Sequence, residues 1–232
     1  HVGLNITPTY DFGNNSATGG NDRNDYYGVW EVVNPIPSIY NAEGTYNTMI
    51  GTTGTWNQPN PVMVLNQVVR KHTSTEIISS GYVSYDILPS LTLKSTINVD
   101  LHNEDQNNFV PSTLGGTNSP PPHIPSGSYS YIKFFNWANE NSLSYQHSFP
   151  GGHSLSVVGD FSEQQEVYQN GAFNGSQYPD DAVTTLNAAA LITGGTNRTA
   201  WGLVSYLGRV NYSYKDKYLV TAAVRKDGSS KF

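Results

Sequence analysis

The feature that most constrains the fold is a run of alternating side chains between Trp201 and Phe232. Lys215-Asp216-Lys217 divides this run into two halves, and it is too short and too charged for anything but a turn. Every second residue of the first half is apolar, aromatic or glycine: Val204, Tyr206, Gly208, Val210, Tyr212 and Tyr214. The residues between them are mainly polar, and residues 218–225 repeat the alternation. Because a period of two is that of a β-strand with one apolar face, the pattern predicts a β-hairpin. Its tyrosine-capped apolar face suits a boundary between lipid and water.

The same period recurs along the chain and predicts about seven strands. Besides the two strands of the hairpin, it marks residues 2–10, 76–88, 91–102, 132–149 and 153–168. Three long stretches separate them, at residues 11–73, 103–130 and 169–199. Within these, residues 61–69 fit a short helix or a strand, and residues 180–192 are modestly helical in pattern.

The connections between the strands alternate strictly between long and short. The short ones are Pro89-Ser90, Pro150-Gly151-Gly152 and Lys215-Asp216-Lys217. Transmembrane barrels have short periplasmic turns on one rim and long extracellular loops on the other. Soluble sandwiches mix loop lengths without this alternation. The order therefore predicts an all-β fold, a segment of an antiparallel up-and-down transmembrane β-barrel.

Composition narrows the possible partners. The 232 residues carry 12 basic and 18 acidic side chains, a net charge of -6, which disfavours a nucleic-acid partner. The absence of cysteine leaves only histidine and carboxylates as metal ligands. No apolar run reaches the ~20 residues of a membrane helix, but a spanning β-strand needs only ~10 residues with every second one apolar.

Residues suited to catalysis or metal binding do not form a recognisable pattern. Neighbouring acids occur at Glu104-Asp105, Glu163/Glu166 and Asp180-Asp181, and solvated loop acids are the favoured interpretation of all three. His102 with Glu104, and the polar run 21–25, could hold a metal such as calcium through oxygen ligands, but a polar turn is the better interpretation. We therefore expect no catalytic residue, no metal and no cofactor.

The long loops are rich in aromatic residues. Flat apolar rings beside amide side chains suit the binding of sugars or peptides, although any single ring can equally pack one loop against another. The candidates that face a substrate or a covering partner are Tyr26, Tyr27, Trp30, Tyr40, Tyr46, Trp56, Phe109, Tyr129, Phe173 and Tyr178.

The segment LGRVNYSYKDKYLVTAAVRKDGSSKF, residues 207–232, resembles a barrel hairpin of the SusC/RagA-type TonB-dependent outer-membrane transporters. Weaker matches lie at residues 35–46, 60–62, 82–99 and 141–158, in the order that the family has. The resemblance implies an interior piece of the barrel, with the plug domain and the remaining barrel elsewhere in the protein. It also implies import of glycan fragments or peptides across the outer membrane of a Gram-negative bacterium, energy from TonB through the plug, and a SusD-like surface lipoprotein as a lid.

Two sets of residues follow from this assignment of faces. Tyrosines near the short turns fit an aromatic girdle against the lipid bilayer: Tyr85, Tyr145, Tyr212, Tyr214 and Tyr218. Polar residues of the opposite face are expected to line the lumen or contact the plug: Lys94, Asn98, Asp100, Arg209 and Asn211. The alternative is a soluble all-β carbohydrate-binding module or surface lectin, in which the same apolar faces would form a core.

Overall fold

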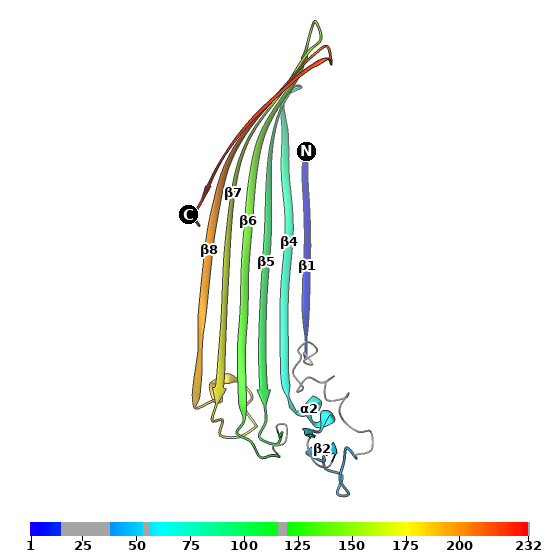
Figure 1. Ribbon diagram of the computed structural model, residues 1–232, viewed down its shortest axis with the longest axis vertical. Helices are drawn as coiled ribbons and strands as arrows, with labels where there is room; N and C mark the ends of the chain where they lie inside the picture. The colour runs from blue at the N-terminus through cyan, green and yellow to red at the C-terminus, as the bar shows by residue number, and fades with distance from the viewer. Residues whose placement is uncertain (15–37, 53–55, 116–119, 232) are drawn as a thin grey trace.

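The computed structural model describes residues 1–14, 38–52, 56–115 and 120–231. Seven strands form one antiparallel sheet in which each strand pairs with the next long strand of the chain (Figure 1). This up-and-down order confirms the predicted all-β architecture. The strands of this sheet are β1 (Val2–Asn14), β4 (Val69–Leu88), β5 (Leu91–Val110), β6 (Ser126–Phe149), β7 (His153–Ser176), β8 (Leu191–Tyr214) and β9 (Tyr218–Ser229).

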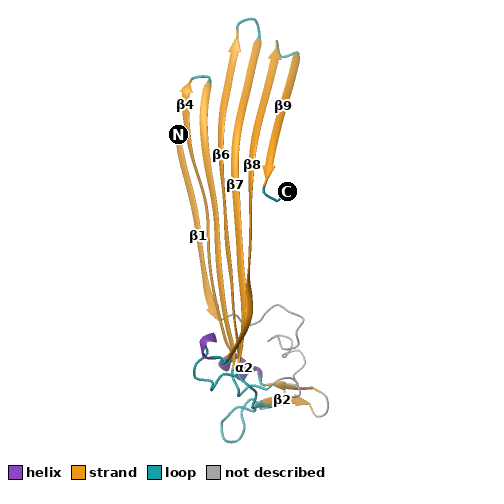
Figure 2. Ribbon diagram, turned by 90° about the vertical axis from the view of Figure 1, so that its left-hand side faces the viewer, coloured by secondary structure: helices purple, strands orange, loops and turns teal. Residues whose placement is uncertain are grey.

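The three short turns lie at one end of the sheet and the long connections at the other (Figures 1 and 2). The turn between β6 and β7 places Gly151 and Gly152 at φ +86, a left-handed conformation that glycine adopts without a steric cost. The turn between β8 and β9 uses the same region at Lys215 and Asp216, with φ of 48 and 53. The alternation of short and long connections is as the sequence predicted.

The strands are longer than the sequence pattern indicated, so the predicted loops were too long. β4 begins at Val69, β5 continues to Val110 and β8 begins at Leu191. In residues 102–108 and 193–199 polar side chains occupy both faces, so the two-residue hydrophobic period disappears. The backbone ladder continues there because each strand still has a paired neighbour to bond with.

Short elements occupy the long connections. A small hairpin of β2 (Met49–Thr52) and β3 (Trp56–Pro59) precedes the helix α2 (Pro61–Gln67), which settles the open choice for this segment as a helix. The helical pattern of residues 180–192 was wrong in extent, since only the 3-10 turn η1 (Leu186–Ala188) forms. Among the described residues, no helix is long and apolar enough to cross a membrane.

The sheet is a single layer, and its buried core is small. The buried apolar side chains of the described residues are Ile50, Met63, Phe109, Leu114 and Tyr178, all at the end with the long connections. Strand residues such as Val2 and Val224 remain 76% and 72% exposed. The strands therefore present their apolar side chains outward without a covering layer from the described chain.

Candidate functional site

The register of the ladder sorts the strand residues onto two faces. Leu93, Leu143, Gly159, Gly208 and Val224 lie directly opposite one another across five strands, in one row of what we term the apolar face. The residues at odd spacing from them form the polar face. Because the period of a strand is two, one such row fixes the faces along the ladder, apart from the end of β4, where the register shifts between Asp86 and Leu88.

The five predicted lumen residues share the polar face. One row of this face runs from Lys94 on β5 through Ser142 on β6 and Asp160 on β7 to Leu207 on β8. Arg209 lies two residues after Leu207 and therefore projects from the same face. Asn98, Asp100 and Asn211 have the same parity, so all five project from one side of the sheet: Lys94, Asn98, Asp100, Arg209 and Asn211. They are spread over β5 and β8 and do not form one cluster.

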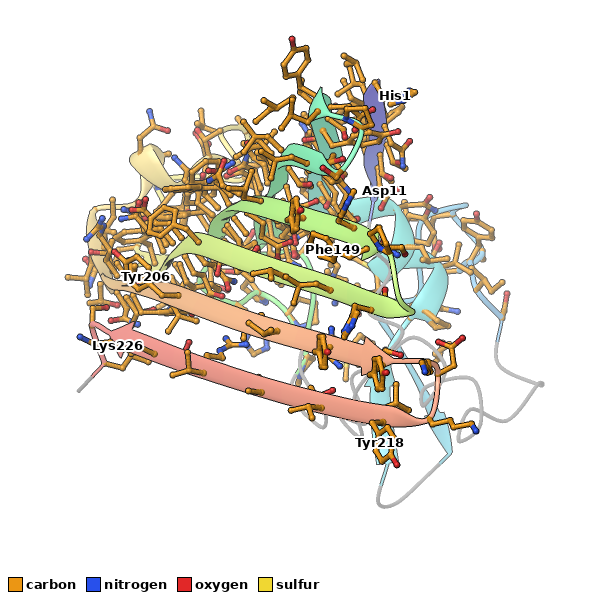
Figure 3. The ribbon with its side chains drawn as sticks, turned by 90° about the horizontal axis from the view of Figure 1, so that it is seen from above. His1, Asp11, Phe149, Tyr206, Tyr218 and Lys226 are labelled. Carbon is orange, nitrogen blue, oxygen red and sulfur yellow. The ribbon has the colours of Figure 1, made fainter. Side chains whose placement is uncertain are left out.

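The apolar face ends in aromatic rings at the turn end of the sheet. All five predicted girdle tyrosines have the parity of this face: Tyr85, Tyr145, Tyr212, Tyr214 and Tyr218. The rings of Tyr214 and Tyr218 stack with their centroids 6.3 Å apart. Lys226, the first charged residue of β9 on this face, lies eight positions after Tyr218 (Figure 3), about 26 Å along a strand. An outer-membrane barrel has an apolar band of about 25 Å.

The apolar band crosses the strands obliquely. Val2, the first apolar residue of β1, falls in the same row as Lys226, where the apolar band of β9 ends. On β1 the band continues from Val2 toward Phe12, while on β9 it runs back from Val224 toward Tyr218. A band that drifts this way across the register means that the strands are tilted relative to it, as closure of a barrel requires.

Hydrogen bonds connect the three long segments at the opposite end of the sheet. Thr113 Oγ1 donates to Gln67 Oε1 at 2.7 Å and so joins the β5–β6 connection to α2. Ser112 donates from its backbone N and its Oγ to Asp181, at 2.8 and 2.7 Å, and so joins the same connection to the β7–β8 segment. We refer to these joined segments as the loop cluster. Sequence reasoning missed these contacts.

Two of the candidate aromatic residues of the first long segment form a stacked pair. The ring centroids of Tyr40 and Tyr46 are 5.2 Å apart, and Asn66 Nδ2 donates to the Tyr46 hydroxyl at 2.9 Å. The electrostatic interaction with Tyr46, more than their hydrogen bond, raises the pKa of Tyr40. Tyr40 is 48% exposed and available to a ligand. Trp56 is described by its backbone in β3, and three further candidates lie outside the described residues: Tyr26, Tyr27 and Trp30.

The other four aromatic candidates lie beside the ends of the strands. Phe109 and Tyr178 are 1% and 6% exposed and pack edge to face with centroids 5.1 Å apart, so they hold the loop cluster together. Burial raises the pKa of Tyr178. Tyr129 and Phe173 lie opposite each other on β6 and β7, on the apolar face beyond the band, where both are half-buried.

The acidic and histidine residues follow the two-face rule as well. Glu104 and Asp105 project from opposite faces of β5, as do Glu163 and Glu166 on β7, so neither pair converges. On the polar face, His72 lies 3.6 Å from both Asp11 and Glu104, and His102 lies 3.6 Å from Glu104. No group of three or more such side chains in the described ranges has a geometry suited to a metal ion. The run 21–25 lies outside the described residues.

Comparison with known proteins identifies relatives of the whole chain, although no family model matches it. TonB-dependent receptor P3 of Formosa agariphila is 32% identical over 245 residues, covering 100% of this chain and 23% of that protein. TonB-dependent receptor P39 of the same organism is 33% identical over 156 residues, 66% of this chain and 15% of that protein. TonB-dependent receptor SusC of Bacteroides thetaiotaomicron is 28% identical over 208 residues, covering 88% of this chain and 19% of that protein.

Solved structures agree in fold. The structure of the RagAB peptide transporter aligns with a TM-score of 0.74 and 16% identity, covering 100% of this chain and 26% of that one. The RagAB peptide importer in its open-open state gives a TM-score of 0.73 at 17% identity, with the same coverage. The chain thus spans about a quarter or less of the length of the proteins that it matches. The sheet thus has the fold of the RagAB structures, and the 32% identity with TonB-dependent receptor P3 over the whole chain shows that the chain belongs to the TonB-dependent receptors.

Proposed function

We propose that the chain forms part of the barrel wall of an outer-membrane TonB-dependent transporter in a Gram-negative bacterium. The observation that carries the proposal is the separation of the two faces. Seven strands share one apolar face, edged by tyrosines at the turn end, and one polar face. A single-layer sheet with exposed valines and leucines on one side needs an apolar medium there, and the lipid bilayer supplies it.

The polar face then lines the lumen or contacts the plug domain. Lys94, Asn98, Asp100, Arg209 and Asn211 are the side chains that a solute or the plug meets on this part of the wall. Their amide, carboxylate and cationic groups can exchange hydrogen bonds with a polar solute. The plug and the remaining barrel belong to the rest of the receptor, and TonB supplies energy through the plug.

The loop cluster faces the outside of the cell, because short turns are periplasmic in such barrels. It is the surface for a SusD-like lipoprotein lid and for a glycan or peptide substrate. Among the described aromatic candidates, Tyr40 with Tyr46 presents the more open rings, and Tyr129 with Phe173 suits contact with a lid at the outer rim. No chemical step is assigned to the chain, because a role in the barrel wall requires none.

Spin labels placed one at a time along β8 of the full-length receptor in lipid vesicles test this assignment. This chain contains no cysteine, so single labels can be placed at positions 206, 208, 210 and 212, and at 205, 207, 209 and 211, in a receptor whose other cysteines, where present, are replaced. We expect the even positions to be accessible to apolar oxygen and the odd positions to a water-soluble nickel complex. If the preferred reagent alternates between oxygen and the nickel complex over all eight positions, the result supports the assignment of β8 to the barrel wall.

Two other results would overturn the proposal. A full-length protein that stays in solution without detergent, with even positions shielded from both reagents, would indicate a soluble carbohydrate-binding module with an apolar core. Uniform accessibility along β8 to the nickel complex would mean that neither face meets lipid.

A further inference from the structure

Two of the short turns are joined at the turn end of the sheet. The backbone N of Lys215, in the β8–β9 turn, donates to the carbonyl oxygen of Gly152, in the β6–β7 turn, at 2.6 Å. A Cβ built on Gly152 would lie 2.9 Å from Lys215 Cγ, so the lysine stem occupies the space that a side chain at position 152 would need. Contacts of both the backbone and the side chain therefore hold Lys215 against the neighbouring turn.

Four side chains converge beside this junction, on the apolar face of β7 and β8. Tyr214 is the direct partner of His153 in the register, and their ring centroids are 4.6 Å apart. The Lys215 ammonium lies over the Tyr214 ring, 5.2 Å from its centroid. Nδ1 of His153 and the hydroxyl of Tyr212 share a hydrogen bond of 2.6 Å. The lysine, the histidine and the two phenols therefore form one contact network, which we term the rim cluster.

The rim cluster has donors that the described chain does not use. With the Tyr212 hydroxyl as the donor to Nδ1 of His153, the hydrogen of the neutral imidazole lies on Nε2. A Cβ at position 151 would lie 3.6 Å from this Nε2, so Gly151 leaves space beside it. Within the described part of the chain, no ion pair involves Lys215. The imidazole N–H and the ammonium are thus available to an external acceptor.

The β8–β9 turn separates its charges between the two faces. Asp216 accepts a hydrogen bond from Ser213 Oγ at 3.3 Å, and Ser213 belongs to the polar face. Over the rows next to the turns, the apolar-face residues of β7, β8 and β9 include no acid: 153, 155 and 157, then 210, 212 and 214, then 218, 220 and 222. A ligand on this face therefore meets an ammonium and an N–H group without a carboxylate, which favours an anion.

We infer that the rim cluster binds the phosphate of one anionic phospholipid of the periplasmic leaflet, with an acyl chain along Leu155 and Val220. The inference rests on the proposed function, which places the short turns on the periplasmic side and the apolar face against lipid. Tyr214 and Tyr218 form the last row before the turn, so they lie at the headgroup level of that leaflet (Figure 3). The periplasmic leaflet of an outer membrane consists of phospholipid. A lysine at the edge of an apolar band extends its ammonium to the phosphates at that level.

Native mass spectrometry of the detergent-solubilised full-length receptor tests the site. The probes are phosphatidylglycerol and phosphatidylethanolamine with identical acyl chains, because the ammonium of the second lipid would meet Lys215 without an acid to bind. We expect preferential retention of phosphatidylglycerol, and Lys215→Gln should reduce that preference about fivefold. His153→Phe removes a donor to the phosphate that both lipids share, so it should reduce retention of both and leave the preference unchanged.

Matched controls lie on the same face outside the rim cluster. Lys226→Gln removes a cation at the loop-side margin of the apolar band. His147→Phe changes a ring of the turn end that packs against Tyr145 and Phe149, with centroids 6.2 and 4.4 Å away. Both variants should leave lipid retention unchanged.

The outcomes separate the lipid site from the transporter assignment. Heat-modifiable migration on gels shows whether each variant has assembled. Tyr212→Phe, which frees the imidazole from its hydrogen bond, replaces His153→Phe if that variant does not assemble. Equal retention of the two lipids by the assembled receptor, or equal effects of the cluster and control variants, overturns the lipid site and leaves the wall assignment intact. Displacement of the lipid by free glycerol phosphate also overturns it and assigns the cluster to a soluble phosphate ester. A receptor that needs no detergent contradicts both assignments.

Discussion

Asp181 accepts two hydrogen bonds from Ser112, one from the backbone N at 2.8 Å and one from Oγ at 2.7 Å. The two residues are separated by 69 positions in the chain. They belong to different long connections, so this contact joins the two connections directly. A carboxylate that accepts both donors of one residue forms a geometrically specific, charge-assisted contact.

Replacing Asp181 by alanine should loosen both connections without affecting the sheet. Loss of the charge-assisted bonds costs about 2 kcal/mol, which corresponds to roughly thirtyfold faster hydrogen exchange at the Ser112 amide. Among the described residues, the hydrogen bond of the adjacent Asp180 is local, from the Ala182 N–H at 2.9 Å, so Asp180→Ala is the control. Equal acceleration in the two variants would contradict the role given to Asp181.

Val210 and Asn211 are consecutive on β8 and project from opposite faces. An arginine at position 210 would enter the lipid, at a cost of about 2–4 kcal/mol near the middle of the bilayer. We therefore expect Val210→Arg to impair assembly of the full-length receptor into the outer membrane and Asn211→Arg to assemble normally. The fraction of heat-modifiable barrel measures this. Equal defects would refute the face assignment.

Asn60 is fully buried and organises the first long segment. Its amide donates to Ile39 O at 2.8 Å and to Asn47 O at 2.9 Å, while its oxygen caps α2 by accepting from Val62 N at 3.0 Å. Asn60→Ala should destabilise this segment by about 2 kcal/mol or more, because a cap is lost and two carbonyls lose their donor. Faster protease cleavage within residues 38–68 would report this.

A graded series sharpens the test of Asn60. Asn60→Asp keeps the capping oxygen and loses the two donors, so its cleavage rate should fall between those of the wild type and Asn60→Ala. The exposed contact of Asn66 with Tyr46 is the control, and Asn66→Ala should be cleaved nearly as slowly as the wild type. Identical rates for Asn60→Ala and the wild type would show that the segment does not depend on this side chain.

Gly127 leaves the space that Tyr178 occupies. A Cβ at position 127 would lie 2.2 Å from the Tyr178 hydroxyl oxygen, and this hydroxyl is buried without a hydrogen-bond partner among the described residues. Gly127→Ala should therefore cost about 1–3 kcal/mol through overpacking. Exchange of the Ala190 amide, which donates to Gln177 O at 3.2 Å, should accelerate accordingly.

Tyr178→Phe provides the complementary test. Removing an unpaired buried hydroxyl should leave the wild-type background unchanged or slightly more stable, and it should partly rescue Gly127→Ala. Gly195→Ala is the neutral control, because its Cβ would meet nothing within 4 Å. Strictly additive effects of the two substitutions would exclude the proposed collision.

Tyr129 donates to Asp105 Oδ1 at 2.5 Å, on strand ends beyond the apolar band. The hydrogen bond to Asp105, with a contribution from burial, raises the pKa of Tyr129 from 10.0 to about 12. Between pH 10 and 12 the tyrosine of the unfolded chain loses its proton before that of the folded protein. The contact therefore makes its full contribution to the stability of the folded state below pH 10, and this contribution is lost as the pH rises toward 12. Titration of isotope-labelled tyrosine by NMR should give this midpoint, and Asp105→Asn should move it toward 10. An unchanged midpoint in Asp105→Asn would contradict the stated cause.

The sequence predicted the strands well wherever one face is apolar. Face membership of Lys94 and Asn211 followed from parity alone, since a period of exactly two allows no drift within a strand. The prediction of strands from alternating apolar residues failed for residues 193–199. Both faces are polar there, so the hydrophobic pattern vanishes although the backbone stays paired. The sequence also could not supply the contact of Ser112 with Asp181, because that depends on how two irregular connections meet in space.

The strand extensions beyond the apolar band have a mechanical consequence. β7 contains 24 residues, more than twice the ~10 that cross a bilayer, so in the proposed wall its loop-side part extends for about 46 Å along the strand beyond the lipid. A ladder of this length is stiff along its strands, so it holds the loop cluster above the headgroup layer. Capture of a large solute, or closure of a lid, would then take place at a fixed height above the membrane surface.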